Sequence, residues 1–384
     1  MSTIFLAGTL PLIASDRTLE VDELSWLDGG CAMAHHFRLK LAGLGFLLFT
    51  FSLLPFAFSL SPGVTVVSRP SDQRVDISID GQPFTSYIYP KSLEKPVLYP
   101  IRSAAGLVVT RGYPLEPRPG ERADHPHHVG HWFNYGDVNG YDFWGNSSET
   151  PANLKPKTGV IVQKAITRAA SGDKQGELSV TADWVIPDGS VLLHEQTRFT
   201  FAGGPGTRTI DRTTTWTAAD KSITFNDTKE GAFGIRVARS LDSPVQQRDA
   251  FVGPDGKRGS PKPDDNVGVT GRYIGSDGKT GDDVWGTTGP WMGLTGSVDG
   301  KPVTIAILDH PSSTNYPTYW HARGYGLFAA NPIGRHAYDP KQPERVLTLE
   351  PGKSATFRFR ILIRDAQLGR EQLQQEQTRF EKEK

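Results

Sequence analysis

Residues 177–218, "ELSVTADWVIPDGSVLLHEQTRFTFAGGPGTRTIDRTTTWTA", decide the fold class of this chain. Three runs rich in Val, Ile, Leu, Thr and aromatic residues often alternate with polar residues, and Asp-Gly or Gly-rich turns separate them. This pattern is typical of consecutive antiparallel strands. The stretch therefore predicts strands rather than helices.

The same pattern extends over most of the chain, from "VTVVS" at residues 64–68 to "SATFRFRILIR" at residues 354–364. No alternation of strands and helices with a Gly-rich phosphate loop accompanies it. We therefore predict an all-β fold, a large antiparallel β-sandwich, as one domain over residues 60–365. Residues 244–283 are rich in Gly, Pro and Asp and predict a long loop, and residues 366–384 predict a solvated helical or disordered tail.

The N-terminal region contains an export signal. From Met33, the basic "HHFRLK" precedes the apolar "LAGLGFLLFTFSLL", and small residues follow at Ala57 and Ser59. We expect residues 33–59 to be a signal peptide, the mature chain to begin near Leu60, and residues 1–32 to be an over-extended gene start. The alternative, a membrane anchor, is disfavoured by the short apolar run and by Pro55. The expected location is periplasmic or secreted.

Composition excludes several classes of function. The chain has 42 Lys and Arg against 42 Asp and Glu, so no net positive charge attracts nucleic acid. The single cysteine, Cys31, precedes the expected signal peptide, and the mature chain would have none. Disulfides, thiolate nucleophiles and cysteine zinc sites are therefore excluded for the mature protein.

Three segments combine aromatic, acidic and amide residues, and the first and third also contain histidines: "ADHPHHVGHWFNYGDVNGYDFWGN" at 123–146, "FNDTKEGAFGIRVARS" at 225–240 and "LDHPSSTNYPTYWHARGYGLFAANPIG" at 308–334. Histidines and carboxylates exchange protons near neutral pH, while aromatic faces and amides bind sugar rings. Loops that pack beneath their own aromatic residues, with surface ion pairs, are the alternative. Because the composition recurs three times, we expect the segments to converge at one pocket.

A metal site is also open to prediction. His125, His127 and Asp137 could supply nitrogen and oxygen ligands to a divalent ion, but their spacing matches no specific metal motif. Metal and cofactor therefore stay unassigned.

Within these segments, "HPHHVGHWFNYGDVNGYDFW", "DTKEGAFGIRVA" and "DHPSSTNYPTYWHARGYGLFAANPIG" resemble the PmoA-like domain family over about residues 64–364. His131 stands where an apolar residue is usual in that family, and we assign it no role. The family name refers to a methane oxygenase subunit, which would need several apolar helices of about 20 residues, so methane oxidation is rejected. The resemblance implies a supersandwich like that of galactose mutarotase and related sugar-acting enzymes.

Two functions follow from these residues. The first is a carbohydrate-active enzyme, a hydrolase, lyase or epimerase, with Glu230 as the carboxylate and three candidate acid-base histidines, His128, His310 and His321. Its predicted substrate-binding residues are His127, Trp132, Asp137, Arg236, Trp320, Arg323 and Asn331. The second is a protein that binds a carbohydrate or another small polar molecule without chemistry. The enzyme is favoured because stacking and hydrogen bonding alone do not require the histidines and the carboxylate.

Overall fold

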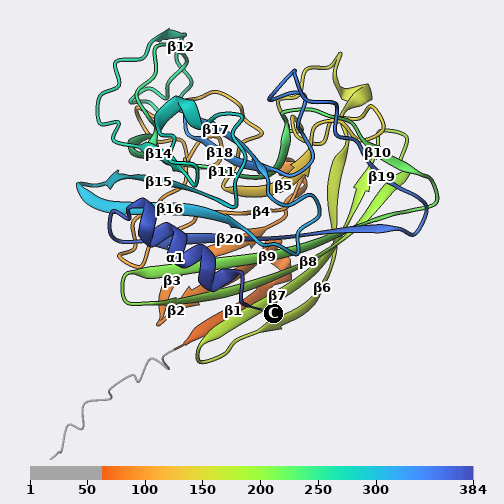
Figure 1. The fold of residues 1–384 in the computed structure, drawn as a ribbon, viewed down its shortest axis with the longest axis horizontal. Coiled ribbons are helices and arrows are strands. Elements are labelled where there is room, and N and C mark those ends of the chain that lie inside the picture. Colours follow the sequence, from red (N-terminus) through yellow and green to blue (C-terminus); the bar gives the residue numbers. More distant parts are fainter. Residues whose placement is uncertain (1–62, 384) are drawn as a thin grey trace, which may run out of the picture. The chain divides into compact units, whose positions relative to one another are not determined.

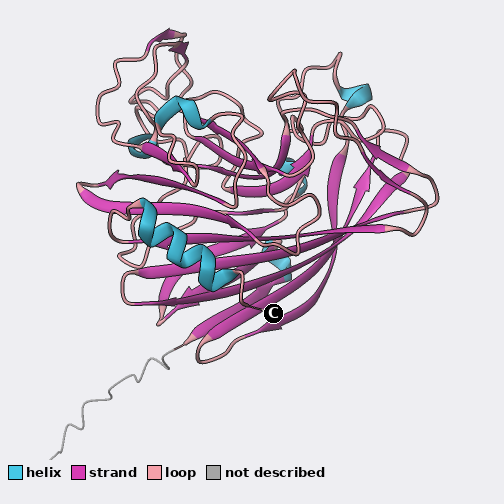
Figure 2. Ribbon diagram, viewed as in Figure 1, coloured by secondary structure: helices cyan, strands magenta, loops and turns pink. Residues whose placement is uncertain are grey.

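The computed structural model of the chain describes residues 63–383, so the expected signal peptide at 33–59 lies outside the described residues. Almost all of the described regular structure is β-strand (Figure 2). The strands form two eight-stranded sheets in which every neighbouring pair is antiparallel. The predicted all-β antiparallel sandwich is confirmed.

The first sheet consists, in spatial order, of β1 (Val64–Arg69), β2 (Arg74–Ile79), β3 (Gln82–Ile88), β4 (Val97–Leu98), β5 (His131–Tyr135), β11 (Gly231–Arg236), β18 (Leu327–Asn331) and β17 (Tyr319–Arg323). The second consists of β14 (Arg272–Gly275), β15 (Trp291–Val298), β16 (Lys301–Asp309), β20 (Ser354–Arg364), β9 (Thr207–Ala218), β8 (Val191–Gly204), β7 (Gln175–Val185) and β6 (Val160–Ala170). Figure 1 shows the long strands β6 to β9 crossing the molecule together.

Smaller elements connect the sheets. Two strand pairs stand outside them, β10 (Ile223–Phe225) with β19 (Leu347–Leu349) and β12 (Arg248–Asp249) with β13 (Lys262–Pro263). Short 3-10 helices are η1 (Pro70–Asp72), η2 (Lys91–Leu93), η3 (Lys155–Lys157), η4 (Arg239–Leu241) and η5 (Gly281–Val284), and the α-helix is α1 (Arg370–Phe380).

The core lies between the two sheets. Residues 177–218 form β7, β8 and β9, and burial alternates along each of these strands over most of its length, as the sequence pattern predicts. Phe133 of the first sheet meets Trp216 and Phe357 of the second, with ring centroids 4.7 and 5.5 Å apart. Burying an aromatic side chain of this kind contributes about 1.5–3 kcal/mol, so these contacts join the sheets.

A charged group is also buried between the sheets. Glu195 accepts hydrogen bonds from the Trp184 indole at 2.9 Å, the Thr197 hydroxyl at 2.7 Å and the Arg212 guanidinium at 2.9 Å. His131 lies beside this group, fully buried, with Nδ1 donating to the Gly234 carbonyl at 2.9 Å. His131 is therefore a core residue.

The C-terminal tail differs from its expected solvated state. Helix α1 packs against β15 and β16 (Figure 1), with Leu373 and Phe380 fully buried and the Trp291 indole donating to Gln374 Oε1 at 2.8 Å. Because so few residues of α1 make the contact with the sheet, the apolar face of the helix is narrow. Residues 244–283, expected to be a loop, also contain β12, β13 and β14.

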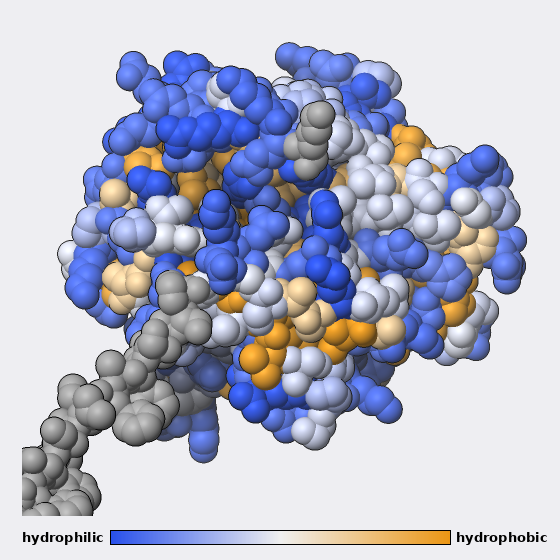
Figure 3. Space-filling view, turned by 90° about the horizontal axis from the view of Figure 1, so that it is seen from below, coloured by the Kyte–Doolittle hydropathy of each residue, from blue (hydrophilic) through white to orange (hydrophobic). Residues whose placement is uncertain are grey.

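The surface seen from below mixes hydrophilic and hydrophobic residues, and the hydrophobic residues lie in several separate areas (Figure 3). The exposed large apolar side chains of the described residues are Val67, Leu115, Leu154, Val162, Val267 and Val346. Within residues 63–383, no helix has the length and apolar character needed to span a bilayer.

Candidate active site

Four adjacent strands of the first sheet form the floor of the candidate site. The pairing of β5, β11, β18 and β17 places Trp132, Gly234, Ala329 and His321 opposite one another in one row. Because side chains alternate between the faces of a sheet, this row shares one face. The neighbouring residues of each strand point into the core between the sheets, so the row lies on the outer face.

A column of stacked rings stands on this floor. The Trp132 indole lies directly over Gly234, where an added Cβ would meet its ring atoms at 2.5 Å. The rings of His128, His125 and Tyr325 follow in nearly parallel steps of 5.0, 4.8 and 5.3 Å between centroids. The column therefore leads from a fully buried tryptophan to side chains at the surface.

His125 is the reactive candidate in this column. Its side chain is 42% exposed, and its backbone adopts φ +41, which is uncommon for a residue other than glycine. Its Nδ1 lies 2.6 Å from Oδ2 of the buried Asp124. Since a carboxylate accepts, Nδ1 donates, and Nε2 of the neutral ring is left as a proton acceptor.

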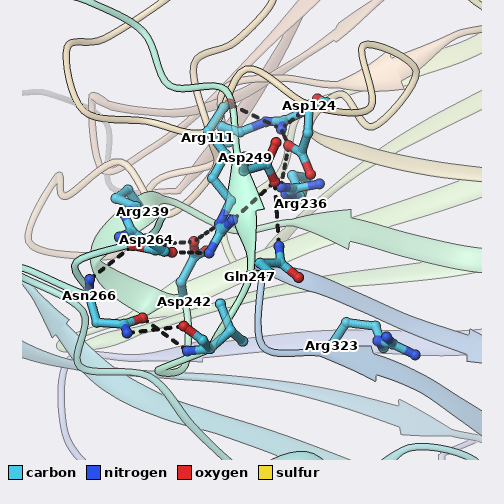
Figure 4. Close-up of polar contacts among 12 residues, drawn as sticks. Arg111, Asp124, Arg236, Arg239, Asp242, Gln247, Asp249, Asp264, Asn266 and Arg323 are labelled. Atoms are coloured by element: carbon cyan, nitrogen blue, oxygen red, sulfur yellow. Dashed lines mark hydrogen bonds and ion pairs between the residues drawn. The ribbon is translucent and has the colours of Figure 1, made fainter. Parts of the chain in front are cut away.

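Two buried arginines hold Asp124 in place. Arg111 and Arg236 donate to Asp124 Oδ1 at 2.5 and 2.6 Å (Figure 4). Arg111 also donates to the carbonyls of His125 and His128 at 2.9 and 3.0 Å. Burial alone would raise the pKa of Asp124, but Arg236, the His125 hydrogen bond and Arg111 together hold it well below its usual range. Asp124 therefore stays ionised and orients His125, as the carboxylate does in an Asp–His pair.

His128, a predicted acid-base residue, has a different place. It is buried with 1% of its surface exposed, and burial lowers its pKa well below the usual range. Arg236 donates to its Nδ1 at 3.2 Å, so the neutral ring carries its proton on Nε2. The acid-base role predicted for His128 is therefore corrected, because this residue packs within the column of rings and supports it. Arg236, predicted to bind substrate, is likewise fully buried against Asp124.

Glu230 and His321 lie on the same outer face. Burial raises the pKa of the Glu230 carboxyl, whose side chain is 35% exposed with Lys229 Nζ at 3.6 Å. His321 Nδ1 donates to the Lys229 carbonyl at 2.9 Å, and burial lowers its pKa to about 3. The neutral ring therefore presents Nε2 as an acceptor.

The structure brings the three segments together. His125 in its protonated form lowers the pKa values of both Glu230 and His321, and Trp144 lies between His128 and His321, with centroids 5.5 and 6.5 Å away. One face thus combines an Asp-oriented imidazole, a carboxyl with a raised pKa and a second neutral imidazole. Such a set can remove a proton from one bound molecule and return one to it.

Two predicted aromatic ligands are core residues instead. Trp132 is fully buried beneath His128 and Trp144, and Trp320 is 1% exposed on the opposite face from His321. Neither can cover a sugar ring as it stands. The half-buried Tyr325 and Trp285 are the accessible aromatic side chains near His125 and Arg323.

His310 lies away from the site. It follows β16 of the second sheet, contacts the Phe380 ring of α1 at 5.1 Å and hydrogen-bonds the Ser312 hydroxyl at 2.7 Å. Its predicted catalytic role is therefore wrong for this site.

Asn331 and Asp137 hold turns. Asn331 Oδ1 accepts from the Ile333 and Gly334 amides at 3.0 and 2.8 Å, and Asp137 Oδ1 accepts from Gly140 and Asn226 at 2.9 and 3.0 Å. Their predicted contact with substrate is corrected to local structural support.

His127 and Arg323 remain beside the site. The half-buried His127 lines a hollow of about 200 Å³, with its ring centroid 4.3 Å from that of His128, and burial lowers its pKa well below the usual range. Arg323 is exposed at the end of β17. Within residues 63–383, no group of three or more His, Cys, Asp or Glu side chains is arranged to hold a metal, so His125, His127 and Asp137 form no such set.

Sequence reasoning missed Asp124 and considered His125 only as a metal ligand. Their adjacency in "ADHPHH" was the available signal, because an aspartate next to a histidine in a loop can fix its tautomer. Tyr325, which stacks on His125, left no such signal.

The fold and this site define an all-β sandwich protein with a cluster of histidine and carboxylate side chains on the outer face of one sheet. The chain belongs to a family of unknown function, DUF6807, whose model matches residues 74–378. The three motifs suggested the PmoA-like family, but the family model that matches is DUF6807. No curated protein matches the chain.

Several solved structures are similar to the chain at low identity. The GH36 α-galactosidase AgaB from Geobacillus stearothermophilus is 13% identical with a TM-score of 0.38, covering 79% of this chain and 41% of that chain. The galactose 1-epimerase from Lactobacillus acidophilus NCFM is 11% identical with a TM-score of 0.34, covering 80% and 100%. A galactose mutarotase-like protein from Clostridium acetobutylicum is 10% identical with a TM-score of 0.30, covering 79% and 98%.

This chain spans about two fifths of the length of the α-galactosidase structures, at 41% and 42%. These similarities carry no argument about what the chain does.

Proposed function

We propose that this protein is a carbohydrate-active enzyme in which His125 and Glu230 exchange protons with a sugar. The observation that carries the proposal is the placement of His125, oriented by Asp124, on the same face as Glu230, a carboxyl with a raised pKa. Pairs of titratable groups in contrasting environments supply the acid and the base of many enzymes.

The proposed base is Nε2 of His125. When it accepts a proton from the substrate, the imidazolium is stabilised by Asp124, 2.6 Å from Nδ1. Arg111 and Arg236 keep Asp124 ionised and fixed. This arrangement costs little reorganisation during the reaction, because the column of rings already fixes the imidazole plane.

The proposed acid is Glu230. Burial favours its protonated form, which can donate to a sugar oxygen, while Nε2 of His321 accepts a hydrogen bond from a neighbouring hydroxyl. In elimination and epimerisation, one proton leaves the substrate for His125 and one reaches it from Glu230, so proton charge balances. In hydrolysis, His125 would take its proton from the attacking water, while Glu230 donates to the leaving sugar oxygen. The product distinguishes the three reactions.

A sugar suits the surroundings of this pair. Tyr325 offers a partly exposed ring, and Lys229 offers an exposed donor. Sugar rings have apolar C–H patches for the ring faces and hydroxyls for the donors.

The test is a product screen by mass spectrometry on plant and microbial glycans, with each variant also measured by isothermal titration. His125→Gln and Glu230→Gln should each lower turnover by about 10²–10⁴-fold, the usual contribution of a positioned base or acid, with sugar affinity largely kept. His194→Gln is the matched control, because His194 is exposed and bonds Asp183 at 2.8 Å on the second sheet. It should leave turnover unchanged.

The result against the proposal is binding of a glycan by the wild type without any product. The protein would then be a carbohydrate-binding protein, and loss of Tyr325 rather than of Glu230 would weaken binding, because stacking area is lost.

The pH profile gives a second test. If Glu230 donates the proton, turnover falls as pH rises through its pKa, which burial places above the usual value of 4.5. His321 stays neutral throughout, because its pKa is about 3. In Glu230→Gln the residual activity should lose this alkaline fall, and an unchanged fall would assign the acid elsewhere.

We also propose that the protein is exported, to the periplasm or the medium. The signal-like run from Met33 supports this. N-terminal sequencing of protein from the native host should begin near Leu60, and a mature chain that retains residues 1–32 would contradict it.

A further inference from the structure

A second hollow lies beside the candidate active site. It has a volume of about 340 Å³ and lies between β17, the turn after it, and residues 245–285. Six polar or aromatic side chains line it: Gln246, Gln247, Asp282, Trp285, Arg323 and Tyr325. Tyr325 also stacks on His125 at 5.3 Å, so one ring separates the hollow from the proposed base.

Arg323 is the charged centre of this hollow. Its guanidinium carbon lies 5.7 Å from the ring centroid of Trp285 and 5.9 Å from that of Tyr325. Among residues 63–383 its side chain has no hydrogen bond or ion pair, and Figure 4 shows it apart from the linked arginines and aspartates. Five N–H donors are therefore held in position by aromatic rings and left for a ligand.

The other lining groups complement these donors. Trp285 is half-buried and presents part of its indole, while Gln246 and Asp282 are exposed and supply amide and carboxylate oxygens. A ring face beside donors and acceptors is the chemistry that a pyranose needs. Because Asp282 and Arg323 carry opposite charges, the hollow has no net charge and suits a neutral sugar.

The side of the hollow formed by residues 245–285 is held in place by buried contacts. The fully buried Arg122 bonds Asp242 and Asp249 at 3.0 Å each, and it also pairs with Asp264. Val245 packs against Gly324, where an added Cβ would meet Val245 Cγ1 at 2.3 Å. The segment predicted to be a long loop is therefore anchored, which reduces the entropy lost on binding.

We propose that the hollow is a second sugar subsite, so that the substrate is an oligosaccharide of at least two linked rings. One ring sits at His125 and Glu230, and the next lies against Trp285 and Arg323. This inference rests on the proposed carbohydrate activity and specifies its substrate class.

The experiment compares chain lengths by isothermal titration. The probes are the monosaccharides, disaccharides and tetrasaccharides of glucose, xylose, mannose and galactose. For the sugar that binds, affinity should increase about tenfold or more from one ring to two, as a stacked ring with hydrogen bonds contributes. Trp285→Ala and Arg323→Gln should each remove most of this gain and leave monosaccharide affinity within about twofold.

Two further variants make the test decisive. Arg248→Gln is the matched control, since Arg248 lies in the same segment, outside the hollow, and bonds the Pro261 carbonyl. It should keep the full gain. Gln246→Ala repeats the test at an exposed position, in case circular dichroism shows that Trp285→Ala does not fold.

The outcomes separate the inference from the proposed function. Equal affinity for one, two and four rings, or an equal loss for all lengths in the variants, overturns the second subsite and leaves the active site standing. Absence of binding and of turnover for every sugar overturns the carbohydrate function itself.

Discussion

Two buried carboxylates of this molecule have similar ion partners and different surroundings. Glu195 lies between the sheets and bonds Arg212 at 2.9 Å, with the Trp184 indole as a further partner. Asp124 lies at the outer face of the first sheet and bonds Arg236 at 2.6 Å. Its further partner is His125, whose side chain is 42% exposed.

The difference between them is the third partner. Around Glu195 every bonded group is buried and lies on β7, β8 or β9, so the network can only stabilise the core side of the second sheet. Around Asp124 the network ends in an imidazole that reaches solvent, so the same ion pairing fixes a tautomer. An arginine–carboxylate pair therefore indicates function only when one of its partners faces outward.

The largest expected effect comes from breaking the closed network. Glu195→Gln leaves the Arg212 charge buried without its carboxylate and should lower the free energy of unfolding by about 3–5 kcal/mol. Denaturant unfolding followed by circular dichroism measures it. Glu177→Gln, which breaks the exposed pair with Arg168 at 3.0 Å, is the control and should cost less than about 1 kcal/mol.

By contrast, His125→Gln should change unfolding little, while turnover falls as proposed above. If His125→Gln and Glu195→Gln destabilised the protein equally, the two networks would serve the same structural purpose.

The sequence was sufficient for the fold class, because the strand pattern is repeated and local. In β9, burial alternates through Ile210, Arg212, Thr214 and Trp216, as the alternation of residues requires. Helix α1 was harder, because its docking depends on two side chains, Leu373 and Phe380, that meet a surface formed by distant strands.

The composition of the three segments was enough to predict where the site lies, but not which of their side chains face it. His321 and Trp320 are neighbours in one motif, yet strand alternation places only His321 on the outer face. The phase of that alternation depends on which face of β17 the second sheet covers, a tertiary fact. For the same reason Trp132 could not be recognised as the buried base of a column, nor His310 as a neighbour of α1.

A third buried carboxylate sharpens the comparison, because Asp309 has no arginine among the described residues. It accepts one backbone hydrogen bond, from Thr318 at 3.0 Å, and its Oδ1 has no partner within residues 63–383. Burial raises the pKa of Asp309 to about 8. Between the usual value near 4 and pH 8, the folded state holds a proton that the unfolded state has lost, so stability falls as pH rises.

Asp309→Asn should remove this dependence, since an amide cannot ionise. The variant should be more stable than the wild type by a few kcal/mol at pH 8, and the difference should vanish near pH 4. Urea unfolding at a series of pH values measures the two slopes. Equal slopes for variant and wild type would mean that Asp309 is ionised and paired in the folded protein.

The smallest stability effect is expected at Gly234, where the two regions meet. Its carbonyl accepts from the core residue His131, while its Cα lies beneath Trp132, the base of the ring column. Gly234→Ala would place a Cβ 2.5 Å from the indole, so the ring must shift outward.

That shift should cost about 1–2 kcal/mol of stability, as overpacking of a buried site does. The larger consequence should be on turnover, because Trp132 displaces His128, and His128 displaces the stacked His125 from its bond with Asp124. Thermal unfolding and kcat on the substrate found in the glycan screen measure the two effects. Gly204→Ala, with no atom within 4 Å of the added Cβ, is the control. A Gly234→Ala protein that loses stability but keeps its turnover would show that the column is packing alone, and that His125 is positioned by Asp124 without it.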